Sequence, residues 1–459
     1  MPVSRYSLVR YGGLTGALLL SASAYLGGAL PAPPGADLTT WSEERGPLVY
    51  VLWLIGTSLL VSAWWVARHD VPSARWAGVT AALWSAPLLA APPLGSRDVY
   101  SYACVGFTYA SGLDPYVHSV ATLPCPWLAS VAPIWRDTPS PYGPLFVLLS
   151  GAMVTLGGTL VASIGLFRAI AVVGVGITGL CLPALARRCE IPEGQAVWLG
   201  MASPLVVIHQ ISGAHNDALM VGLLVAGLAL VTSSPGRALA LLGGGALLGL
   251  AGAVKATAWV AVPFAALVAI AGPYTLRRFI RCLGLMISGV ATALIVVSLV
   301  SGLSLGWVGG LVRSGDVVGW TAPSAAVGVI VEHAAGILGL RARAVDASRV
   351  ATIVPFAVIL MVLWWCARHG QALHRAGLAL AAAAVLAPRF HPWYATWPLA
   401  VLAATVWRTH WLVLPCVVAC FVVLPDGRSI LRSTRLPGEL LTIGLIAWAG
   451  MLVVRRLRS

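Results

Sequence analysis

The chain is built from long apolar segments that short polar segments separate. Runs of about 18 or more apolar residues are typical of membrane-spanning helices, because a helix of about 20 residues crosses the hydrocarbon core. Such runs recur between residues 11 and 454. The pattern therefore predicts an all-α polytopic membrane protein with about 14 transmembrane helices.

The predicted spans share an apolar core, and most are flanked by Arg residues or turns. They lie at 11–30, 47–66, 76–94, 164–186, 196–211, 216–237, 238–254, 282–300, 350–367, 376–388, 393–406, 411–424 and 440–454, with one more that ends before residue 277.

Residues 145–188 can be divided into one crossing or two. Two crossings would place Arg187 and Arg188 outside, whereas one crossing places them in the cytoplasm, where short loops carry an excess of Arg and Lys. We therefore expect one span, preceded by a re-entrant or interfacial helix on the outer side. Residues 325–340, which contain Glu332 and His333, resemble a second short helix of this kind.

Composition and charge agree with a membrane protein. The chain is 59% hydrophobic and 10% charged, which excludes an ordinary soluble protein of several domains. Its net charge of +14 comes mainly from Arg residues between the apolar runs. This distribution follows the positive-inside bias, so it indicates cytoplasmic loops rather than nucleic-acid binding. Both termini are expected on the cytoplasmic side.

The longest polar interruption is the segment 95–144, which follows the third predicted span. On this topology it lies outside the membrane, as do the GAHND stretch at 213–217, the region 301–347 and the RFHPWY stretch at 389–394. The topology is assigned from the positions of the Arg residues, and that assignment does not require these polar stretches to lie on the same side. We therefore interpret residues 1–459 as one transmembrane domain with a catalytic loop at 95–144 and a second outer region at 301–347.

Asp98 is the candidate catalytic residue. It lies just beyond a predicted span, between Arg97 and Tyr100, where solvent meets the membrane surface. Transfer of a sugar needs a base that removes the proton of the acceptor hydroxyl, and a carboxylate suits this role. The alternative is structural: an ion pair with Arg97 or a helix cap.

The other candidates are aromatic or polar residues that could bind a sugar, and cations that could bind a phosphate. They are Arg97, Tyr100, Asp114, Tyr142, His215, Asn216, Asp217, Lys255, Arg313, Arg389, His391 and Trp393. Several have a structural alternative: Asp114 could cap a turn, Asn216 or Asp217 could cap a helix, Lys255 could extend to the membrane interface, and the tyrosines could lie in an interfacial aromatic belt. For Arg389 the functional interpretation is favoured, because His391 and Trp393 lie on the same turn.

Neither the cysteines nor the acidic residues form a metal-binding pattern. The sequence has no DxD, HExxH, Walker or GxGxxG motif in a suitable context, which argues against nucleotide-driven transport and nucleotide-sugar chemistry. Cys104 and Cys125 both lie in the segment 95–144. They could form a disulfide if that segment faces an oxidising compartment, or they could remain free.

Several of these stretches together resemble a known family. SRDVYSYACVGFTYASGLDPY, SPYGPLF, GAHNDALMVGLLVAG, VKATAWVAVPF and RFHPWYATWPLAV are similar to actinobacterial α-1,6-mannosyltransferases of the MptA/MptB type, within the GT-C superfamily. The similarity extends over residues 96–400, which is most of the chain.

The resemblance implies a GT-C fold and an inverting transfer of mannose from polyprenyl-phosphate mannose to a mannan or lipoglycan acceptor, such as lipomannan. The site would face the outside of the bacterial plasma membrane, with Asp98 as the base and His215, Asn216 and Asp217 in support. No cofactor is expected. Arg97 stands where related enzymes often have a second acidic residue, which puts a metal requirement in doubt. A different lipid-linked sugar, such as glucose or arabinofuranose, and a lipid or sugar transporter are the alternatives.

Overall fold

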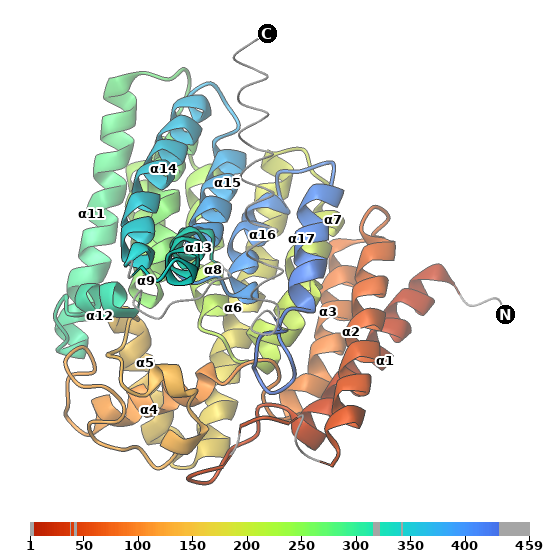
Figure 1. Cartoon of the computed structure of the whole chain (residues 1–459). Coiled ribbons are helices and arrows are strands. Elements are labelled where there is room, and N and C mark those ends of the chain that lie inside the picture. Colours follow the sequence, from red (N-terminus) through yellow and green to blue (C-terminus); the bar gives the residue numbers. More distant parts are fainter. Residues whose placement is uncertain (1–3, 37, 41–43, 315–321, 341–342, 431–459) are drawn as a thin grey trace.

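The computed structural model describes the chain except for residues 1–3, 37, 41–43, 315–321, 341–342 and 431–459 (Figure 1). Within the described ranges the regular structure is helical and contains no strand, which confirms the predicted all-α class. The last predicted span, 440–454, lies outside the described residues.

The α-helices are α1 Arg5–Gly27, α2 Gly46–Ala67, α3 Ala74–Ala90, α4 Asp98–Ala110, α5 Pro144–Gly157, α6 Leu160–Arg188, α7 Glu193–Met201, α8 Asp217–Ser233, α9 Ala238–Val254, α10 Val262–Val268, α11 Leu276–Ser301, α12 Trp307–Ser314, α13 Pro323–Ile337, α14 Ala344–Ala367, α15 Ala372–Val385, α16 Thr396–Leu402 and α17 His410–Cys420. Shorter 3₁₀ segments are η1 Leu128–Ser130, η2 Pro133–Trp135, η4 Ala256–Ala261 and η5 Pro392–Ala395, and η3 Val206–Ser212 is a π-helix.

Most of the long helices run roughly along one direction, whereas α4 lies across one end of the bundle (Figure 1). Among the described helices, α2, α6, α11 and α14 are long and apolar enough to cross a membrane. The bent pair η3 and α8, whose axes differ by 110°, would make a fifth crossing if it forms one span. The structure thus agrees with a membrane protein, and the count of about 14 spans stays a prediction.

Residues 145–188 form two separate helices. The helix α6 is continuous over 29 residues, and the 14-residue helix α5 precedes it, with Gly158 in the left-handed conformation between them. This division matches the single long span and the short preceding helix expected from the sequence. The short helix expected at 325–340 is present as α13.

Two predicted spans are wrong as continuous helices. The span at 196–211 is broken between α7 and η3, around Pro204, whose ring removes a backbone donor and disfavours an uninterrupted helix. The span at 393–406 begins with the 3₁₀ turn η5 and continues only through the seven-residue α16. The second break lies at the candidate site, where residues of η5 line the cavity.

Small residues allow the elements around the polar segment to pack closely. A Cβ on Gly106 of α4 would lie 2.3 Å from the Ser150 carbonyl oxygen of α5. A Cβ on Gly143, just before α5, would lie 2.3 Å from the Ala253 carbonyl oxygen of α9. Because real Cβ atoms do not approach this closely, these glycines fix how near α4, α5 and α9 lie to one another.

Candidate active site

Asp98 is the first residue of α4, and its surroundings hold it in place. Gly95 adopts a left-handed conformation at φ 73° and donates from its backbone nitrogen to the Pro425 carbonyl, 2.9 Å away. The Asp98 nitrogen donates to the Ser96 hydroxyl at 3.1 Å. An acidic residue is favourable in the first turn of a helix, since the helix dipole is positive there. The expected irregular loop thus contains a helix that begins at the candidate base.

The Asp98 side chain borders a cavity of about 480 Å³ and is 15% exposed. The cavity lies between α4, the 120–142 segment, η4, α14 and the end of α15 with η5. One part of its lining is polar and includes Asp98, Tyr142, Lys255, Arg389 and His391. Another part is apolar and includes Val260, Leu311, Ile353, Phe356 and Leu386. A ligand with a polar head and an apolar tail fits such a lining.

Three charged or titratable side chains lie in a row behind Asp98. The Asp98 Oδ2 atom is 3.7 Å from His215 Nδ1, which in turn is 4.0 Å from Asp217 Oδ2. The other oxygen of Asp217, Oδ1, forms an ion pair with Lys255 Nζ at 2.8 Å. The Asp217 side chain is fully buried, so Lys255 neutralises a charge that would otherwise be costly there. Four of the candidates thus come together.

The environment of Asp98 changes its acidity. Its helix α4 is not among the helices that could span a membrane. Burial raises the pKa of the Asp98 carboxyl to about 6; the positive charge of Lys255 opposes this rise, and the negative charge of Asp217 adds to it. A carboxylate with a pKa in this range can accept a proton near neutral pH and still be largely deprotonated before the reaction.

Aromatic rings enclose the polar end of the cavity. The His391 ring stacks on Trp393 at 4.4 Å between centroids, and Trp393 lies 4.2 Å from the ring of His215. The Lys255 ammonium is 4.3 Å from the Tyr394 ring centroid, a cation–π distance. Trp397 donates from its indole nitrogen to Asp217 Oδ1. These rings cover part of the charged groups and leave Asp98 and Lys255 partly exposed to the cavity.

Several contributing residues were not among the sequence candidates: Tyr102, Trp135, Tyr394 and Trp397. The spacing of Tyr394 and Trp397 is a helical i, i+3 pair, and their rings stack at 4.3 Å. That spacing beside His391 could have drawn attention to both. No comparable signal exists for Trp135, whose ring lies 5.8 Å from the Arg389 guanidinium carbon.

Three candidates in the first polar segment have structural roles instead. Arg97 neither pairs with Asp98 nor lines the cavity, and it donates to the carbonyls of Leu30 and Ser130 at 2.9 and 3.4 Å. The Tyr100 hydroxyl donates to the Ala29 carbonyl. Asp114 accepts from the Tyr116 nitrogen at 2.8 Å, which is the turn cap considered as its alternative.

Of the remaining candidates, four line the cavity and Asn216 does not. Asn216 occupies the N-cap position of α8, but its side chain makes no capping hydrogen bond; its Oδ1 accepts from the Tyr102 hydroxyl at 3.5 Å. The capping alternative is therefore wrong for Asn216. Tyr142, Arg389, His391 and Trp393 line the cavity. The side chain of Arg313, in α12, lies outside the part that the structure describes.

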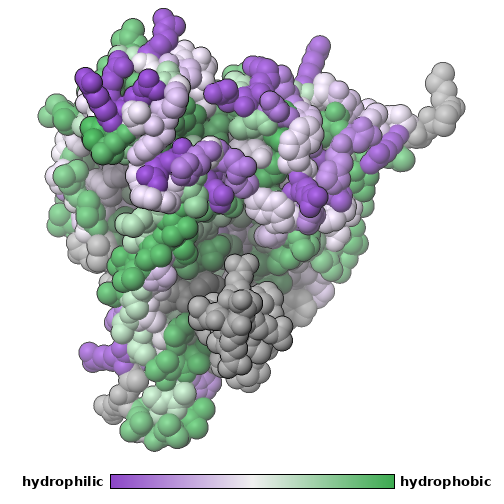
Figure 2. Space-filling model, turned by 90° about the horizontal axis from the view of Figure 1, so that it is seen from above, coloured by the Kyte–Doolittle hydropathy of each residue, from purple (hydrophilic) through white to green (hydrophobic). Residues whose placement is uncertain are grey.

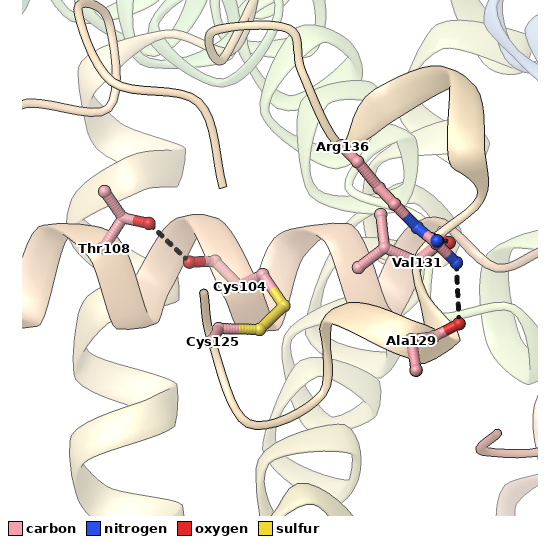
Figure 3. Close-up of a disulfide and its surroundings, with 6 residues drawn as sticks. All are labelled: Cys104, Thr108, Cys125, Ala129, Val131 and Arg136. Atoms are coloured by element: carbon pink, nitrogen blue, oxygen red, sulfur yellow. Dashed lines mark hydrogen bonds between the residues drawn. A yellow bond between two sulfur atoms is a disulfide. The ribbon is translucent and has the colours of Figure 1, made fainter. Parts of the chain in front are cut away.

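A disulfide joins Cys104 of α4 to Cys125 of the following segment, with the two Cα atoms 5.5 Å apart (Figure 3). The question left open by the sequence is thus answered in favour of a bridge. Nearby, Arg136 donates to the carbonyls of Val131 and Ala129 at 3.0 and 2.9 Å. The disulfide ties the irregular segment 111–140 to α4, and the Arg136 bonds brace that segment internally, so both support one wall of the cavity.

Among the described residues, no three His, Cys, Asp or Glu side chains come together in a way that could hold a metal ion. The charged side chains among the described residues that line the cavity are one carboxylate, Asp98, and the cations Lys255, Arg349 and Arg389.

Known proteins resemble this chain over most of its length. Residues 10–271 match a family described as alpha-(1→6)-mannopyranosyltransferase, N-terminal domain, and residues 324–454 match the MptB C-terminal domain. No solved structure matches.

Curated relatives give the same family. Alpha-(1→6)-mannopyranosyltransferase A of Mycobacterium tuberculosis is 36% identical over 77% of this chain and 76% of its own length. Alpha-(1→6)-mannopyranosyltransferases A and B of Corynebacterium glutamicum are 29% and 28% identical, over 94% and 93% of this chain and 93% and 78% of their own lengths. The family and the enzyme class expected from the sequence are confirmed. The chain belongs to the MptA/MptB family of glycosyltransferases.

Proposed function

We propose that this protein transfers mannose from polyprenyl-phosphate mannose to the end of an α-1,6-linked mannan at the outer face of the plasma membrane. We further propose a GT-C fold with about 14 spans, because apolar runs of suitable length recur along the chain. The observation that carries the functional proposal is the cavity itself, in which the Asp98 carboxylate, the cations Lys255 and Arg389, and an apolar wall lie together.

The reaction is a single displacement. The acceptor hydroxyl oxygen attacks the anomeric carbon of the donor, and its proton passes to the Asp98 carboxylate. The bond between the anomeric carbon and the phosphate oxygen breaks, and its electron pair leaves with polyprenyl phosphate. A β-linked donor then gives an α-linked product, since the attack comes from the opposite face. Asp98 suits this role because its pKa of about 6 leaves it deprotonated at neutral pH.

The leaving phosphate gains negative charge as the bond breaks, and cations stabilise that charge. Arg389 and His391 lie on the same turn at the cavity wall, and Lys255 lies on its polar side. Arg389 is the best suited of the three, because Arg binds phosphate oxygens in a bidentate manner. Lys255 is already paired with Asp217, so its contribution comes through that pair rather than as an isolated cation.

The rest of the cavity suits the remaining parts of the two substrates. Val260, Ile353 and Phe356 form an apolar wall. Ile353 is 63% exposed on α14, a helix whose apolar surface faces outward, so the wall adjoins a surface from which a lipid chain can enter. Tyr142 and Tyr394 present aromatic rings at the cavity that a sugar can contact.

The donor assignment can be tested by offering the purified protein three lipid-linked sugars with one acceptor. The donors are polyprenyl phosphates that carry mannose, glucose or arabinofuranose, and the acceptor is an α-1,6-dimannoside. We expect transfer from the mannose donor alone, with a new α-1,6 linkage detected by mass spectrometry and by digestion with a linkage-specific mannosidase. Preferential transfer of glucose or arabinofuranose would contradict the proposed donor, and a new β linkage would contradict inversion.

A further inference from the structure

A second cavity, of about 740 Å³, lies at the opposite end of the bundle from α4. It is formed where α6 and α14 end, where α15 begins, and by the residues that follow α10 and α16. In Figure 1 the junction of α14 and α15 lies at the top, far from α4. Figure 2, seen from that end, shows hydrophilic residues gathered over much of the face. We call this site the basic cavity.

Four side chains that line the basic cavity are basic. They are Arg188, Arg368, His369 and His374, and none of the described residues that line it is acidic. The nearby Glu193 carboxylate is occupied by Arg187, at 2.7 Å. Neither Arg188 nor Arg368 has an ion pair with a described residue. A concave site with this lining attracts an anion.

Arg368 is held at the cavity by aromatic rings. Its guanidinium carbon is 3.2 Å from the Trp365 ring centroid and 5.4 Å from that of Tyr274. Its Nε donates to the Trp365 carbonyl at 3.2 Å. A guanidinium fixed in this way loses little additional freedom when it binds a phosphate, which favours the bidentate contact that Arg makes.

The start of α15 adds to the positive potential. Residues 370–373 line the cavity, and the N-cap residue Gln371 adopts a left-handed conformation at φ 58° without a capping side-chain hydrogen bond. The first-turn backbone N–H groups of this 14-residue helix therefore lack a side-chain cap. Together with the helix dipole, uncapped N–H groups beside two arginines favour a phosphate.

The surroundings of the basic cavity indicate where such a phosphate comes from. Leu267, Val268 and Ile270 contribute apolar surface to the cavity. The helix α14, which ends there, exposes apolar residues along its length, and Met361 and Trp365 are 68% and 57% exposed. An outward apolar helix that ends at a basic cavity is the arrangement in which anionic lipid headgroups bind between membrane helices.

We propose that the basic cavity binds a phosphate group, supplied by an anionic lipid of the leaflet that the arginine-rich end borders. The phosphate contacts Arg188 and Arg368 and the start of α15, and the acyl chains lie along α14. A soluble phosphate is the other possible source of the same chemistry. This site is separate from the candidate active site, and the proposal does not depend on the proposed function.

The test measures lipid binding by native mass spectrometry of the full-length protein in neutral detergent. Dioleoyl phosphatidylglycerol is the probe, dioleoyl phosphatidylcholine is the neutral comparison, and inorganic phosphate is added as a soluble competitor. We expect the anionic lipid to bind more tightly than the neutral one. Arg188→Gln and Arg368→Gln should each weaken its binding about tenfold, since each removes a charge-assisted hydrogen bond.

Arg237→Gln is the matched control, because Arg237 is an exposed arginine at the start of another helix and does not line the basic cavity. It should bind the anionic lipid as the unmodified protein does. Arg188 is exposed and makes no cation–π contact with a described ring, so Arg188→Gln remains informative if Arg368→Gln unfolds.

Loss of lipid binding in the two variants supports a lipid headgroup as the source. A soluble source is supported if the unmodified protein binds inorganic phosphate, the two variants lose that binding, and the anionic lipid binds no more tightly than the neutral one. Two results would overturn the proposal. In the first, all three variants bind phosphatidylglycerol and phosphate as the unmodified protein does. In the second, the unmodified protein binds the two lipids equally and added phosphate has no effect.

Discussion

The carboxylates Asp98 and Asp217 lie in one polar cluster but in different surroundings. Asp217 is fully buried, pairs with Lys255 and accepts a hydrogen bond from Trp397. Asp98 borders the cavity, and among the described residues it has no Lys or Arg within ion-pair distance; the His215 imidazole lies 3.7 Å away. A paired, buried carboxylate maintains the site, whereas an unpaired carboxylate at a cavity can exchange a proton with a substrate.

The first prediction concerns pH. A base acts in its deprotonated form, so activity is lost as the pH falls through its pKa. Burial raises the pKa of Asp98 to about 6, from the ordinary value of about 4. We expect kcat/KM for mannosyl transfer to decline below pH 6, by about tenfold per unit. A profile that stays flat to pH 5, with the protein still folded, would contradict this assignment.

The second prediction concerns the buried ion pair. Lys255→Met leaves the Asp217 carboxylate buried without its cation, which should lower the free energy of unfolding by about 3–5 kcal/mol. Adding Asp217→Asn removes the unpaired charge and should restore part of that loss. The thermal midpoint of the detergent-solubilised variants measures both effects. If the double variant is less stable than Lys255→Met alone, the account that Lys255 stabilises the protein by neutralising the buried Asp217 charge is contradicted.

Residue types predicted part of the site and failed where side-chain direction depends on distant parts of the chain. Lys255, Arg389 and His391 are polar residues beside predicted spans, and all three line the cavity. Arg97 is also a charged residue beside a predicted span, but its side chain donates to the carbonyls of Leu30 and Ser130. The position of those carbonyls follows from tertiary packing, which neighbouring residues in the sequence do not encode.

At the scale of the elements, α4 and the segment 111–140 form a wall of the cavity. The Cys104–Cys125 bridge closes a loop of 21 residues between them, and α4 packs closely on α5 at Gly106. Because the segment 111–140 contains only the short 3₁₀ turns η1 and η2, the bridge and the Arg136 hydrogen bonds replace a regular backbone ladder there.

The third prediction therefore concerns this bridge. Replacing both cysteines by Ala should lower the free energy of unfolding by about 3 kcal/mol, as expected for a loop of this size. It should also make residues 111–132 more susceptible to limited proteolysis. Cys366→Ala, at an exposed free cysteine, serves as the control and should change neither property. Unchanged proteolysis of the bridge variant would show that packing alone holds the segment.

The helices themselves follow from the apolar pattern to different degrees. Predicted and observed bounds agree at α9, and they differ by a few residues at α2 and α6, where long apolar runs end at Arg or Gly. The pattern could not predict the break before η3 or the start of α4. The apolar run continues through Pro204, and Asp98 begins a helix within a segment that appears irregular by composition.

At the scale of the whole molecule, the two cavities lie at opposite ends of the bundle. One combines Asp98 with cations and an apolar wall, and the other combines arginines and histidines with no acidic residue among the described residues that line it. The positive-inside bias is the basis on which we propose that the arginine-rich end is cytoplasmic and the Asp98 end lies outside. That orientation suits a disulfide in the segment 111–140, because disulfides persist in oxidising compartments.

The fourth prediction tests this orientation by cysteine labelling in a Cys366→Ser background. Val117 is exposed near α4, and Ala271 is exposed near the basic cavity. A membrane-impermeant maleimide should label Val117→Cys in intact cells. It should label Ala271→Cys only after the cells are permeabilised. The reverse pattern would place the proposed active site in the cytoplasm and would contradict transfer at the outer face.

The most direct measurement of the central claim compares mannosyl transfer by the unmodified protein with transfer by Asp98→Asn. Asp137→Asn is the matched control, because Asp137 is an exposed carboxylate of the same polar segment that does not line the cavity. With polyprenyl-phosphate mannose and an α-1,6-dimannoside, we expect Asp98→Asn to lose transfer by about 10²–10⁴-fold while its thermal midpoint is retained. The control should retain transfer. Undiminished transfer by folded Asp98→Asn would contradict Asp98 as the base.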